Sequence, residues 1–167
     1  MTSAPRPQVV VRPAVLQDAE AIAAVHHGSW VETYCDLLPA AHWETDTLER
    51  RTERWRRGLE SGVPATVAEV DGRVVGLALA GDAIAVGPHV PVRERHLFIL
   101  YVLAVHHGTG VGQALLDAVV PPGTPAQLWV AEENPRARRF YERNRFVADG
   151  ARHVDEGSGI AEVRLVR

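Results

Sequence analysis

Residues 97–116 restrict the fold of this 167-residue chain more than any other stretch. Residues 97–105 are almost all apolar and rich in β-branched and aromatic types, which predicts a strand buried on both faces. Gly108, Gly110 and Gly112 follow, and the apolar residues after them recur on one helical face. A strand, a glycine loop and a helix in this order direct several backbone N–H groups and the positive end of a helix dipole at one place. Such a junction can bind a phosphate or a diphosphate.

Other interpretations use the same glycines. A tight strand-to-helix turn without a ligand needs them too, because glycine adopts left-handed conformations at no steric cost. A Rossmann dinucleotide site expects an acidic residue about 20 positions after the glycines, where Glu132 lies. That motif stands near the start of its βαβ unit, however, whereas residues 1–96 precede the strand here. A P-loop is excluded because no Gly-Lys-Ser/Thr sequence ends the loop.

The composition restricts the class of protein and its partners. Hydrophobic residues make up 46% of the chain and charged residues 23%, and the length suits one domain with a proper core. The net charge of −3 and pI near 6.2 predict neither nucleic acid nor an anionic membrane as the main partner. No apolar run approaches a membrane span, and the first eight residues lack a signal-peptide core. The single cysteine, Cys35, rules out an internal disulfide, so we expect a cytoplasmic protein in which Cys35 is a small buried residue.

The patterns along the chain predict one mixed α/β domain over residues 9–167, preceded by a flexible segment, residues 1–8. Asp71-Gly72 is a strong hairpin signal, and residues 82–95 have prolines, a glycine and no clear period, which predicts a loop. Apolar periodicity and chain breaks predict helices over residues 18–34, 47–59, 111–120 and 134–144, and strands over residues 9–12, 65–70, 74–80, 97–105, 126–130, 146–148 and 161–166.

This order of elements, together with two motifs, resembles the GNAT superfamily of acetyl-coenzyme A-dependent N-acetyltransferases. Residues 100–116 are similar to the family's cofactor motif, in which Gln or Arg, two variable residues, Gly, one variable residue and then Gly or Ala follow a strand. Residues 134–146 are similar to its second motif, Asn-x-x-Ala-x-x-Phe-Tyr-Glu followed by a short turn and Phe. The resemblance implies an α+β domain with a central mixed, mostly antiparallel sheet of six to seven strands and about four helices. It also implies a splayed strand pair that forms the coenzyme A cleft.

Three positions depart from the family pattern. His107 stands where Gln or Arg is usual, and we expect it to present its backbone N–H instead. Ala104 stands where Pro is common. Arg145 replaces the usual Gly before Phe146, so we expect Asn144 to adopt the left-handed conformation at the helix end.

The resemblance implies acetyl-coenzyme A as co-substrate and assigns roles to the two motifs. Backbone groups of the strand would pair with the pantetheine arm and the acetyl carbonyl, and the N–H groups of the glycine loop would hold the diphosphate. The arginines at positions 136, 138 and 139 either approach the adenosine phosphates or form a solvated helix face. The implied cofactor-binding residues are Leu100, Tyr101, Val102, Gly108, Thr109, Gly110, Val111, Gly112, Gln113 and Asn134. Asn134 would bond the pantetheine, and it is equally suited to cap the helix before Pro135.

Two catalytic groups are predicted. By resemblance, Tyr141 is the general acid, because a phenol with a pKa near 10 stays protonated and can donate to the departing thiolate; otherwise it is a core residue beside Phe140. The acceptor amine must first lose a proton, since its pKa of about 10.4 keeps it almost fully charged at neutral pH. His96 is the predicted base because the ordinary pKa of histidine lies near neutrality, unless it is a hydrogen-bonded structural residue. Glu94 and Glu32 are the alternatives.

Trp30 and Tyr34, with the 82–95 loop, are the predicted wall for the acceptor. The segment Trp30-Val-Glu-Thr-Tyr34 is similar to a Trp-x-x-x-Tyr element in many bacterial members of the superfamily. Core packing is the other interpretation of Trp30. The histidine pairs at residues 26–27 and 106–107 do not predict a metal site, because neighbours on a helix diverge by about 100° and no spaced ligands complete a set.

The resulting prediction is an enzyme that moves an acetyl group from acetyl-coenzyme A to the primary amine of a small molecule. Direct attack in a ternary complex is expected, because no activated Cys or Ser suggests an acyl-enzyme. Acetylation of a protein N-terminus or lysine is a second interpretation, and a non-catalytic acyl-coenzyme A sensor is a third. The resemblance adds a homodimer as an expectation, since members of the superfamily are often dimers.

Overall fold

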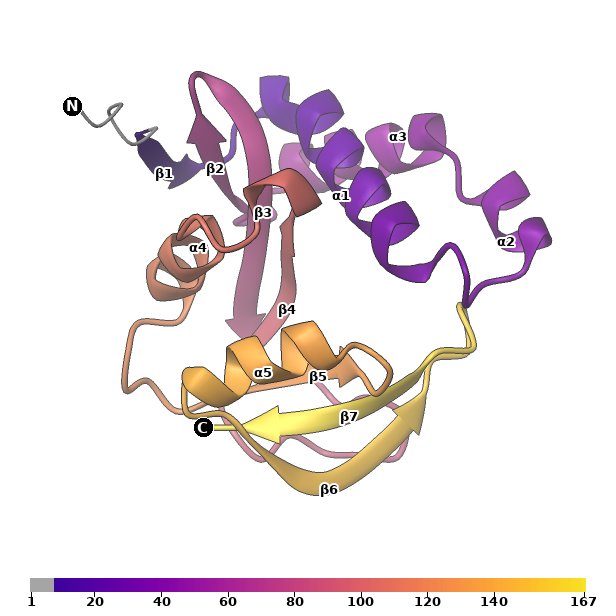
Figure 1. Cartoon of the computed structure of the whole chain (residues 1–167), viewed down its shortest axis with the longest axis vertical. Coiled ribbons are helices and arrows are strands. Elements are labelled where there is room, and N and C mark those ends of the chain that lie inside the picture. Colours follow the sequence, from indigo (N-terminus) through magenta and orange to yellow (C-terminus); the bar gives the residue numbers. More distant parts are fainter. Residues whose placement is uncertain (1–7) are drawn as a thin grey trace, which may run out of the picture.

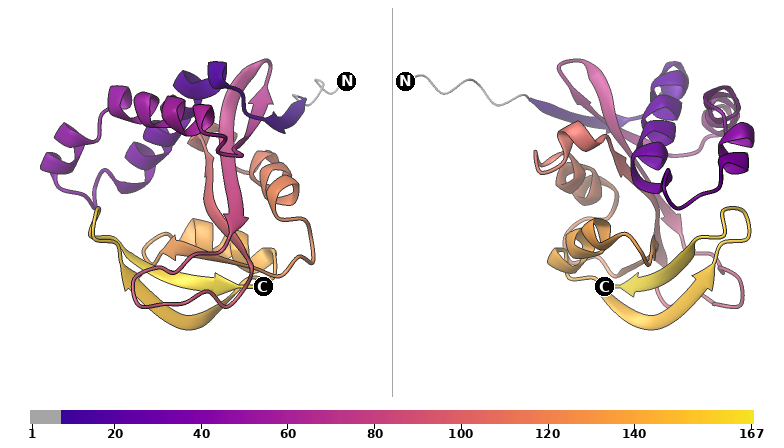
Figure 2. Two further views of the ribbon diagram at one scale, coloured as in Figure 1. Left: turned by 180° about the vertical axis from the view of Figure 1, so that it is seen from behind. Right: turned by 45° about the vertical axis from the view of Figure 1, so that its right-hand side comes forward.

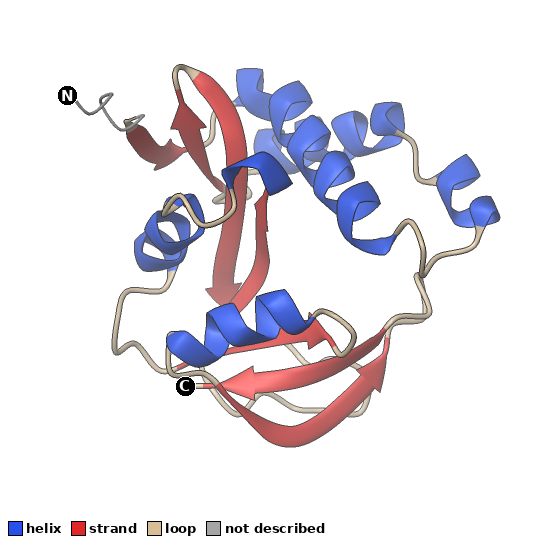
Figure 3. Cartoon of the chain, in the orientation of Figure 1, coloured by secondary structure: helices blue, strands red, loops and turns tan. Residues whose placement is uncertain are grey.

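A computed structural model of the chain describes residues 8–167, which form a seven-stranded sheet with helices on both faces (Figures 1 and 3). The segment 1–7, most of the predicted flexible N-terminus, lies outside the described residues. The strands are β1 (Val9–Pro13), β2 (Thr66–Val70), β3 (Arg73–Asp82), β4 (Arg95–Val102), β5 (Ala126–Ala131), β6 (Val147–Val154) and β7 (Ala161–Val166). The helices are α1 (Ala19–Tyr34), α2 (Ala40–Thr45), α3 (Leu48–Glu60), α4 (Val111–Val119) and α5 (Pro135–Arg143), with short 3-10 turns at Leu16–Asp18 and Ala104–His106.

The sheet confirms the predicted mixed, mostly antiparallel arrangement. Its strand order is β1-β2-β3-β4-β5-β7-β6, and only the β4–β5 pair is parallel. The predicted β2–β3 hairpin is present, and both of its turn residues, Asp71 and Gly72, have positive φ angles of 50° and 73°. This conformation matches the right-handed twist of the flanking strands.

The β4–β5 pair separates along its length, as predicted. The two strands are in register only where Arg95–Leu97 faces Ala126–Leu128, and beyond these residues they diverge. Figures 1 and 2 show the result: β1–β4 and β5–β7 form two halves that part at this junction. Between β3 and β4 the register also shifts, leaving Phe98 as an extra residue in β4. Such a β-bulge bends and twists its strand, here at the point where β4 leaves β5.

Separate hydrophobic cores lie on the two faces of the sheet. On one face, α4 and α5 pack against the strands, and Leu100 and Val102 of β4 contact this core. On the other face, α1 and α3 pack against the strands, and Ile99 and Tyr101 contact that core. Alternation along a strand therefore directs successive β4 side chains to opposite faces of the sheet.

Some elements differ from the prediction. The described part of the chain has five α-helices rather than about four, because α2 begins directly after Pro39, where only a chain break was expected. Strand β6 runs to Val154, well beyond the predicted end at Ala148. Most of its side chains are exposed, so the apolar alternation that marks a strand is missing. Cys35 is exposed after the last turn of α1, so the expectation of a buried cysteine is wrong. Within residues 8–167, no helix has the length and apolar character needed to cross a membrane.

The end of α5 shows which residue replaces the usual glycine. Arg145 has a φ of 67°, whereas Asn144 has a φ of −92°, so the prediction of a left-handed Asn144 is wrong. The N–H of Phe146 donates to the carbonyl of Tyr141 (3.0 Å), and the N–H of Arg145 donates to the carbonyl of Glu142 (2.9 Å). These two bonds form a Schellman motif, which requires the left-handed conformation at the residue just before Phe146.

Candidate active site

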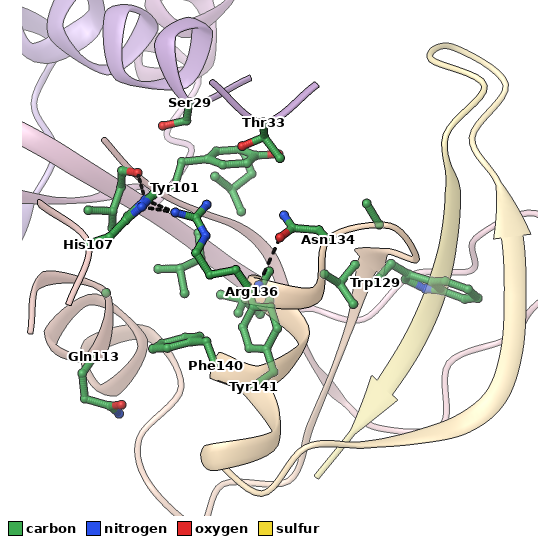
Figure 4. A pocket seen from close by; sticks show the side chains of 18 of the residues that line it. Ser29, Thr33, Tyr101, His107, Gln113, Trp129, Asn134, Arg136, Phe140 and Tyr141 are labelled. Carbon is green, nitrogen blue, oxygen red and sulfur yellow. Dashed lines mark hydrogen bonds between the residues drawn. The ribbon is translucent and has the colours of Figure 1, made fainter. Parts of the chain in front are cut away.

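A cavity of about 390 Å³ occupies the gap where β4 and β5 separate (Figure 4). Its lining comes from both faces of the sheet, so the cavity passes through the sheet. We call its two parts the α4 side and the α1 side. The α4 side is lined by Leu100, Val102, His107, Gly108, Gly110, Gly112, Gln113, Arg136, Ala137, Phe140 and Tyr141, and the α1 side by Ser29, Thr33, Tyr34, Phe98, Tyr101, Trp129, Ala131 and Glu162.

Backbone amides at the start of α4 face the α4 side. Gly108 and Gly110 have left-handed φ angles of 75° and 95°, which turn the chain from β4 into the helix. The first helical hydrogen bond runs from the N–H of Ala114 to the carbonyl of Gly110 (2.9 Å). The amides of residues 111–113 therefore have no partner within the helix and, with the helix dipole, suit an anion. Gly108, Gly110, Gly112 and Gln113, four of the residues predicted to bind the cofactor, line the cavity.

The edge of β4 supplies further backbone groups. The N–H of Leu103 donates to the carbonyl of Val75 across the β3–β4 ladder (3.0 Å). Because alternate residues of an antiparallel strand bond to the same neighbour, the backbone groups of Leu100 and Val102 face the opposite edge, toward the gap. The carbonyl of Val102 accepts a hydrogen bond from Nε2 of His107 (2.8 Å). The Leu100 N–H and carbonyl point toward the gap, where an extended ligand chain can pair with them.

His107 acts through its ring rather than its amide. Its N–H donates to the carbonyl of Ala104 (3.0 Å), so the prediction that this amide faces the diphosphate is wrong. Figure 4 shows Arg136 reaching from α5 to the His107 ring, with Nη1 2.8 Å from Nε2 and in contact with Nδ1. A guanidinium only donates, so Nδ1 accepts from Arg136 while Nε2–H donates to Val102. The contact places a permanent positive charge beside the glycine loop.

Two residues of the second motif have the predicted positions. The Asn134 side chain caps α5 by accepting from the N–H of Ala137 (3.1 Å), and its amide group also lies close to the Tyr34 hydroxyl (Figure 4). The amide nitrogen has two hydrogens, so one N–H can still bond a ligand. Both roles predicted for Asn134 are therefore compatible. Tyr141 lines the cavity although it is only 7% exposed. Burial, assisted by the nearby phenols of Tyr101 and Tyr34, raises the pKa of Tyr141 above the ordinary value, so the phenol stays protonated at neutral pH.

Other members of the predicted cofactor set contribute little through their side chains. Val111 is fully buried in the core, and Thr109 is exposed with its hydroxyl donating to the carbonyl of His106 (2.7 Å). Gln113 stands at the edge of the cavity and donates to the side chain of Asn144 (2.8 Å). These positions offer backbone groups to a ligand rather than side-chain recognition.

On the α1 side, Trp30 supports the wall and Tyr34 forms part of it. The indole N–H of Trp30 donates to the hydroxyl of Tyr101 (2.9 Å), and the Trp30 ring packs edge-on against Tyr34 (4.9 Å between centroids). Tyr34 and Tyr101 line the cavity, whereas Trp30 stands behind them. The structure therefore fits the packing interpretation of Trp30, which does not itself line the cavity but holds two side chains that do.

A second layer fixes this arrangement. The Arg51 guanidinium lies 5.0 Å from the centre of the Trp30 ring and bonds to Asp46 (2.8 Å). His26 stacks on Tyr101 with centroids 4.9 Å apart and accepts a hydrogen bond from Trp55 (3.1 Å). Burial, together with the Arg51 charge, lowers the pKa of His26 to about 3, so it remains a neutral acceptor.

None of the predicted bases lines the cavity. His96 is 3% exposed and stacks on Phe98 (4.2 Å between centroids), and burial lowers its pKa to about 4. Glu32 accepts a hydrogen bond from the N–H of Ala104 (3.0 Å), and Glu94 is exposed before β4. The predicted loop is also elsewhere: residues 83–94 run beside β6 and β7, where Arg164 donates to the carbonyl of Val90 (2.8 Å; Figure 2). Among residues 8–167, no three potential ligand side chains gather as a metal site.

Glu162 is a residue of the cavity that the sequence analysis missed. It lies on β7 opposite Ala131 of β5, and it lines the α1 side. Burial, and secondarily the negative charge of Asp155, raise the pKa of Glu162 to about 7. No special signal marks it in the sequence, because Glu162 and Arg164 occupy the polar positions between Ala161, Val163 and Leu165 of an alternating strand. Only the strand order, with β7 between β5 and β6, brings Glu162 to the cavity.

Comparison with known proteins identifies the family. Residues 23–146 match the acetyltransferase (GNAT) family model. The chain is 29% identical to the uncharacterized N-acetyltransferase YuaI of Bacillus subtilis, over 94% of this chain and 88% of the relative. It is 30% identical to an uncharacterized N-acetyltransferase of Mycobacterium tuberculosis, over 86% of this chain and 82% of the relative.

Solved structures share the fold. The PaiA N-acetyltransferase of Thermoplasma acidophilum, solved in complex with coenzyme A, has a TM-score of 0.64 at 19% identity, over 93% of this chain and 98% of that one. A Corynebacterium glutamicum structure described as histone acetyltransferase HPA2 and related acetyltransferase has a TM-score of 0.69 at 22% identity, over 95% of this chain and 94% of that chain. The chain therefore belongs to the GNAT acetyltransferase family. It is an N-acetyltransferase with acetyl-coenzyme A as the acetyl donor.

Proposed function

We propose that this enzyme acetylates the primary amine of a small molecule by direct attack in a ternary complex. The observation that carries the proposal is the cavity at the gap in the sheet, whose lining residues come from both the α4 side and the α1 side. Its volume of about 390 Å³ is within the usual range of small-molecule sites. The two substrates would meet at the gap between β4 and β5.

On the α4 side, backbone groups and one cation suit acetyl-coenzyme A. The amides of residues 111–113 and the guanidinium of Arg136 would hold the diphosphate, since charge-assisted hydrogen bonds favour an anion at a helix start. The exposed edge of β4 at Leu100 would pair with the pantetheine, and the Asn134 amide nitrogen would bond it from α5. These contacts would bring the thioester into the gap.

The chemistry then needs a proton for the leaving group. The neutral amine attacks the thioester carbonyl, the N–C bond forms and the C–S bond breaks. Tyr141 would protonate the departing thiolate, because its buried phenol keeps its proton at neutral pH. Holding both substrates in one cavity would supply the orientation that such an attack requires.

The test is thiol release from acetyl-coenzyme A with a panel of small primary amines and a set of peptides with free N-termini. Turnover with at least one small amine, exceeding that with every peptide, is the expected result. Turnover with peptides alone would move the proposal to protein acetylation. Tight binding of coenzyme A without thiol release in any mixture would indicate a sensor instead.

A further inference from the structure

We infer that Glu162 binds the acceptor as an ammonium ion and then takes its proton, which makes a positively charged aliphatic amine the preferred substrate class. The inference rests on the proposed function and assigns the base that the reaction needs. None of His96, Glu94 and Glu32 lies in the cavity, whereas Glu162 does.

The position of Glu162 supports this role. Its register partner on β5 is Ala131, whose small side chain leaves room beside the gap, and its partner on β6 is His153. Glu162 lines the same cavity as Tyr34, Tyr101 and Tyr141, so the carboxylate and the general acid face one space across the gap. Burial raises the pKa of Tyr34 and Tyr101, and the negative charge of Glu162 adds to this effect.

The carboxylate of Glu162 is also available for a ligand. Within residues 8–167, no protein donor lies within hydrogen-bond distance of it, whereas the nearby Asp155 carboxylate accepts from the N–H and hydroxyl of Ser158 (2.7 and 2.8 Å). A half-buried carboxylate without a donor is costly unless a cation or a proton compensates it. An ammonium group that binds on the α1 side would supply both the positive charge and the proton. Aromatic rings of Tyr34 and Trp129 in the same wall favour a cationic ligand further.

The proton balance is complete with the groups of the cavity. The ammonium gives one proton to the Glu162 carboxylate, and the neutral nitrogen attacks the thioester carbonyl. As the C–S bond breaks, Tyr141 protonates the thiolate. The remaining surplus proton on nitrogen passes to the Tyr141 phenolate, and Glu162 releases its proton to water. One proton is therefore released for each acetyl group transferred, and the enzyme is restored.

The pH dependence follows from the groups around Glu162, which are Tyr34 of α1, Tyr101 of β4, His153 of β6 and Asp155 of the β6–β7 turn. With a pKa of about 7, Glu162 is a carboxylate above neutral pH, so kcat/KM for an amine should rise through this range. The folded-state pKa lies above the ordinary 4.5, so its contribution to stability is present at low pH and is lost as the pH rises through about 7. A Glu162→Gln variant should lose both the rise of kcat/KM with pH and this dependence of stability on pH.

The test uses two acceptors of similar size, benzylamine and phenylhydrazine, in the thiol-release assay at about pH 7.5. Benzylamine is a cation at this pH, whereas phenylhydrazine is neutral and needs no base before attack. Glu162→Gln should lower kcat/KM for benzylamine about 100-fold but that for phenylhydrazine less than about threefold, with an unchanged KM for acetyl-coenzyme A. Equal losses for the two acceptors, or no loss for benzylamine, would overturn the inference.

Glu156→Gln is the matched control, because it removes the same charge from an exposed position on the β6–β7 turn; both acceptors should be used as by the wild type. Failure of the wild type to acetylate either acceptor would count against the proposed function. The role of Glu162 is then tested separately, by measuring whether it binds an ammonium ion. Benzylamine is then titrated calorimetrically into the complex with coenzyme A. Binding that is about tenfold weaker in Glu162→Gln supports the ammonium site, and equal or absent binding in wild type and variant overturns it.

Discussion

The two sides of the cavity are built by different means. The α4 side is made largely from the backbone of one continuous segment, residues 100–113, with Arg136 and Asn134 added from α5. The α1 side is made from side chains that come from α1, β4, β5 and β7, held in place by the layer behind Trp30. A diphosphate can be recognised by amides alone, which every residue except proline has. Under the proposed function, the acceptor would be recognised by side chains from several elements, so its identity depends on residues that no single segment of the chain contains.

The largest effect is expected where the two sides meet. Tyr141→Phe should lower kcat about 100-fold or more, because the thiolate would leave without a proton donor, while the Kd for coenzyme A stays the same. Steady-state kinetics and calorimetry measure the two quantities. An unchanged kcat, in conditions where the chemical step limits the rate, would remove the acid role of Tyr141 and would leave it as a core residue.

A tenfold effect is expected on the α4 side alone. In Gly112→Ala the new methyl group would make only ordinary contacts, 3.8 Å from Phe140 and 3.9 Å from Val102, so the fold should tolerate it. The methyl would hold the diphosphate away from the amides, and the Kd for coenzyme A should rise about tenfold, or 1.4 kcal/mol. The Tm should not fall, because alanine favours a helix.

Gly58→Ala in α3 is the matched control for this variant. Its added methyl would also meet only ordinary contacts, 3.5 Å from Val63, in a helix remote from the cavity. It should leave coenzyme A binding unchanged. If Gly112→Ala binds coenzyme A as tightly as Gly58→Ala does, the diphosphate does not rest on the start of α4.

A smaller effect, confined to binding of the acceptor, is expected from a substitution on the α1 side. Trp30→Phe removes the hydrogen bond to the Tyr101 hydroxyl and should lower the free energy of unfolding by about 1 kcal/mol. The KM for the amine should rise a few-fold while the Kd for coenzyme A is unchanged, since only the acceptor wall loses support. Ser61→Ala, which removes the hydrogen bond from the Ser61 hydroxyl to the carbonyl of Gly58 (2.9 Å) at the end of α3 without touching the cavity, serves as the control. A rise in the coenzyme A Kd would show that the two sides are not independent.

The smallest effect lies outside both sides. Arg145→Gly should raise the free energy of unfolding by about 1 kcal/mol without changing kcat/KM. Arg145 has a left-handed φ, which is unfavourable for a residue with a Cβ atom and is not unfavourable for glycine. Asn144→Gly should give no such gain, since Asn144 has a negative φ and donates to the carbonyl of Phe140 (3.0 Å). Denaturant unfolding compares the two variants. The opposite ranking would mean that Asn144 carries the left-handed conformation.

The contrast between the two sides also explains what the sequence could predict. The strand, the glycine loop and α4 are contiguous, so their pattern predicted an anion site, and the resemblance of residues 134–146 to the second family motif implied that α5 lies beside it. Glu162 lies 61 positions after Tyr101 in the chain, and only the strand order brings both to one cavity. His96 was preferred as the base for its ordinary pKa, but burial beside Phe98 lowers that pKa and removes it from the site.

The donor site is tested most directly by a calorimetric titration of the wild type with coenzyme A, which needs no knowledge of the acceptor. We expect saturable 1:1 binding, with a Kd in the range of about 1 μM to 1 mM that is typical of enzyme substrates. Raising the salt concentration should weaken the binding, since Arg136 and the helix dipole would hold an anion. Absence of heat and of saturation up to several millimolar coenzyme A would contradict the claim that the α4 side is a donor site.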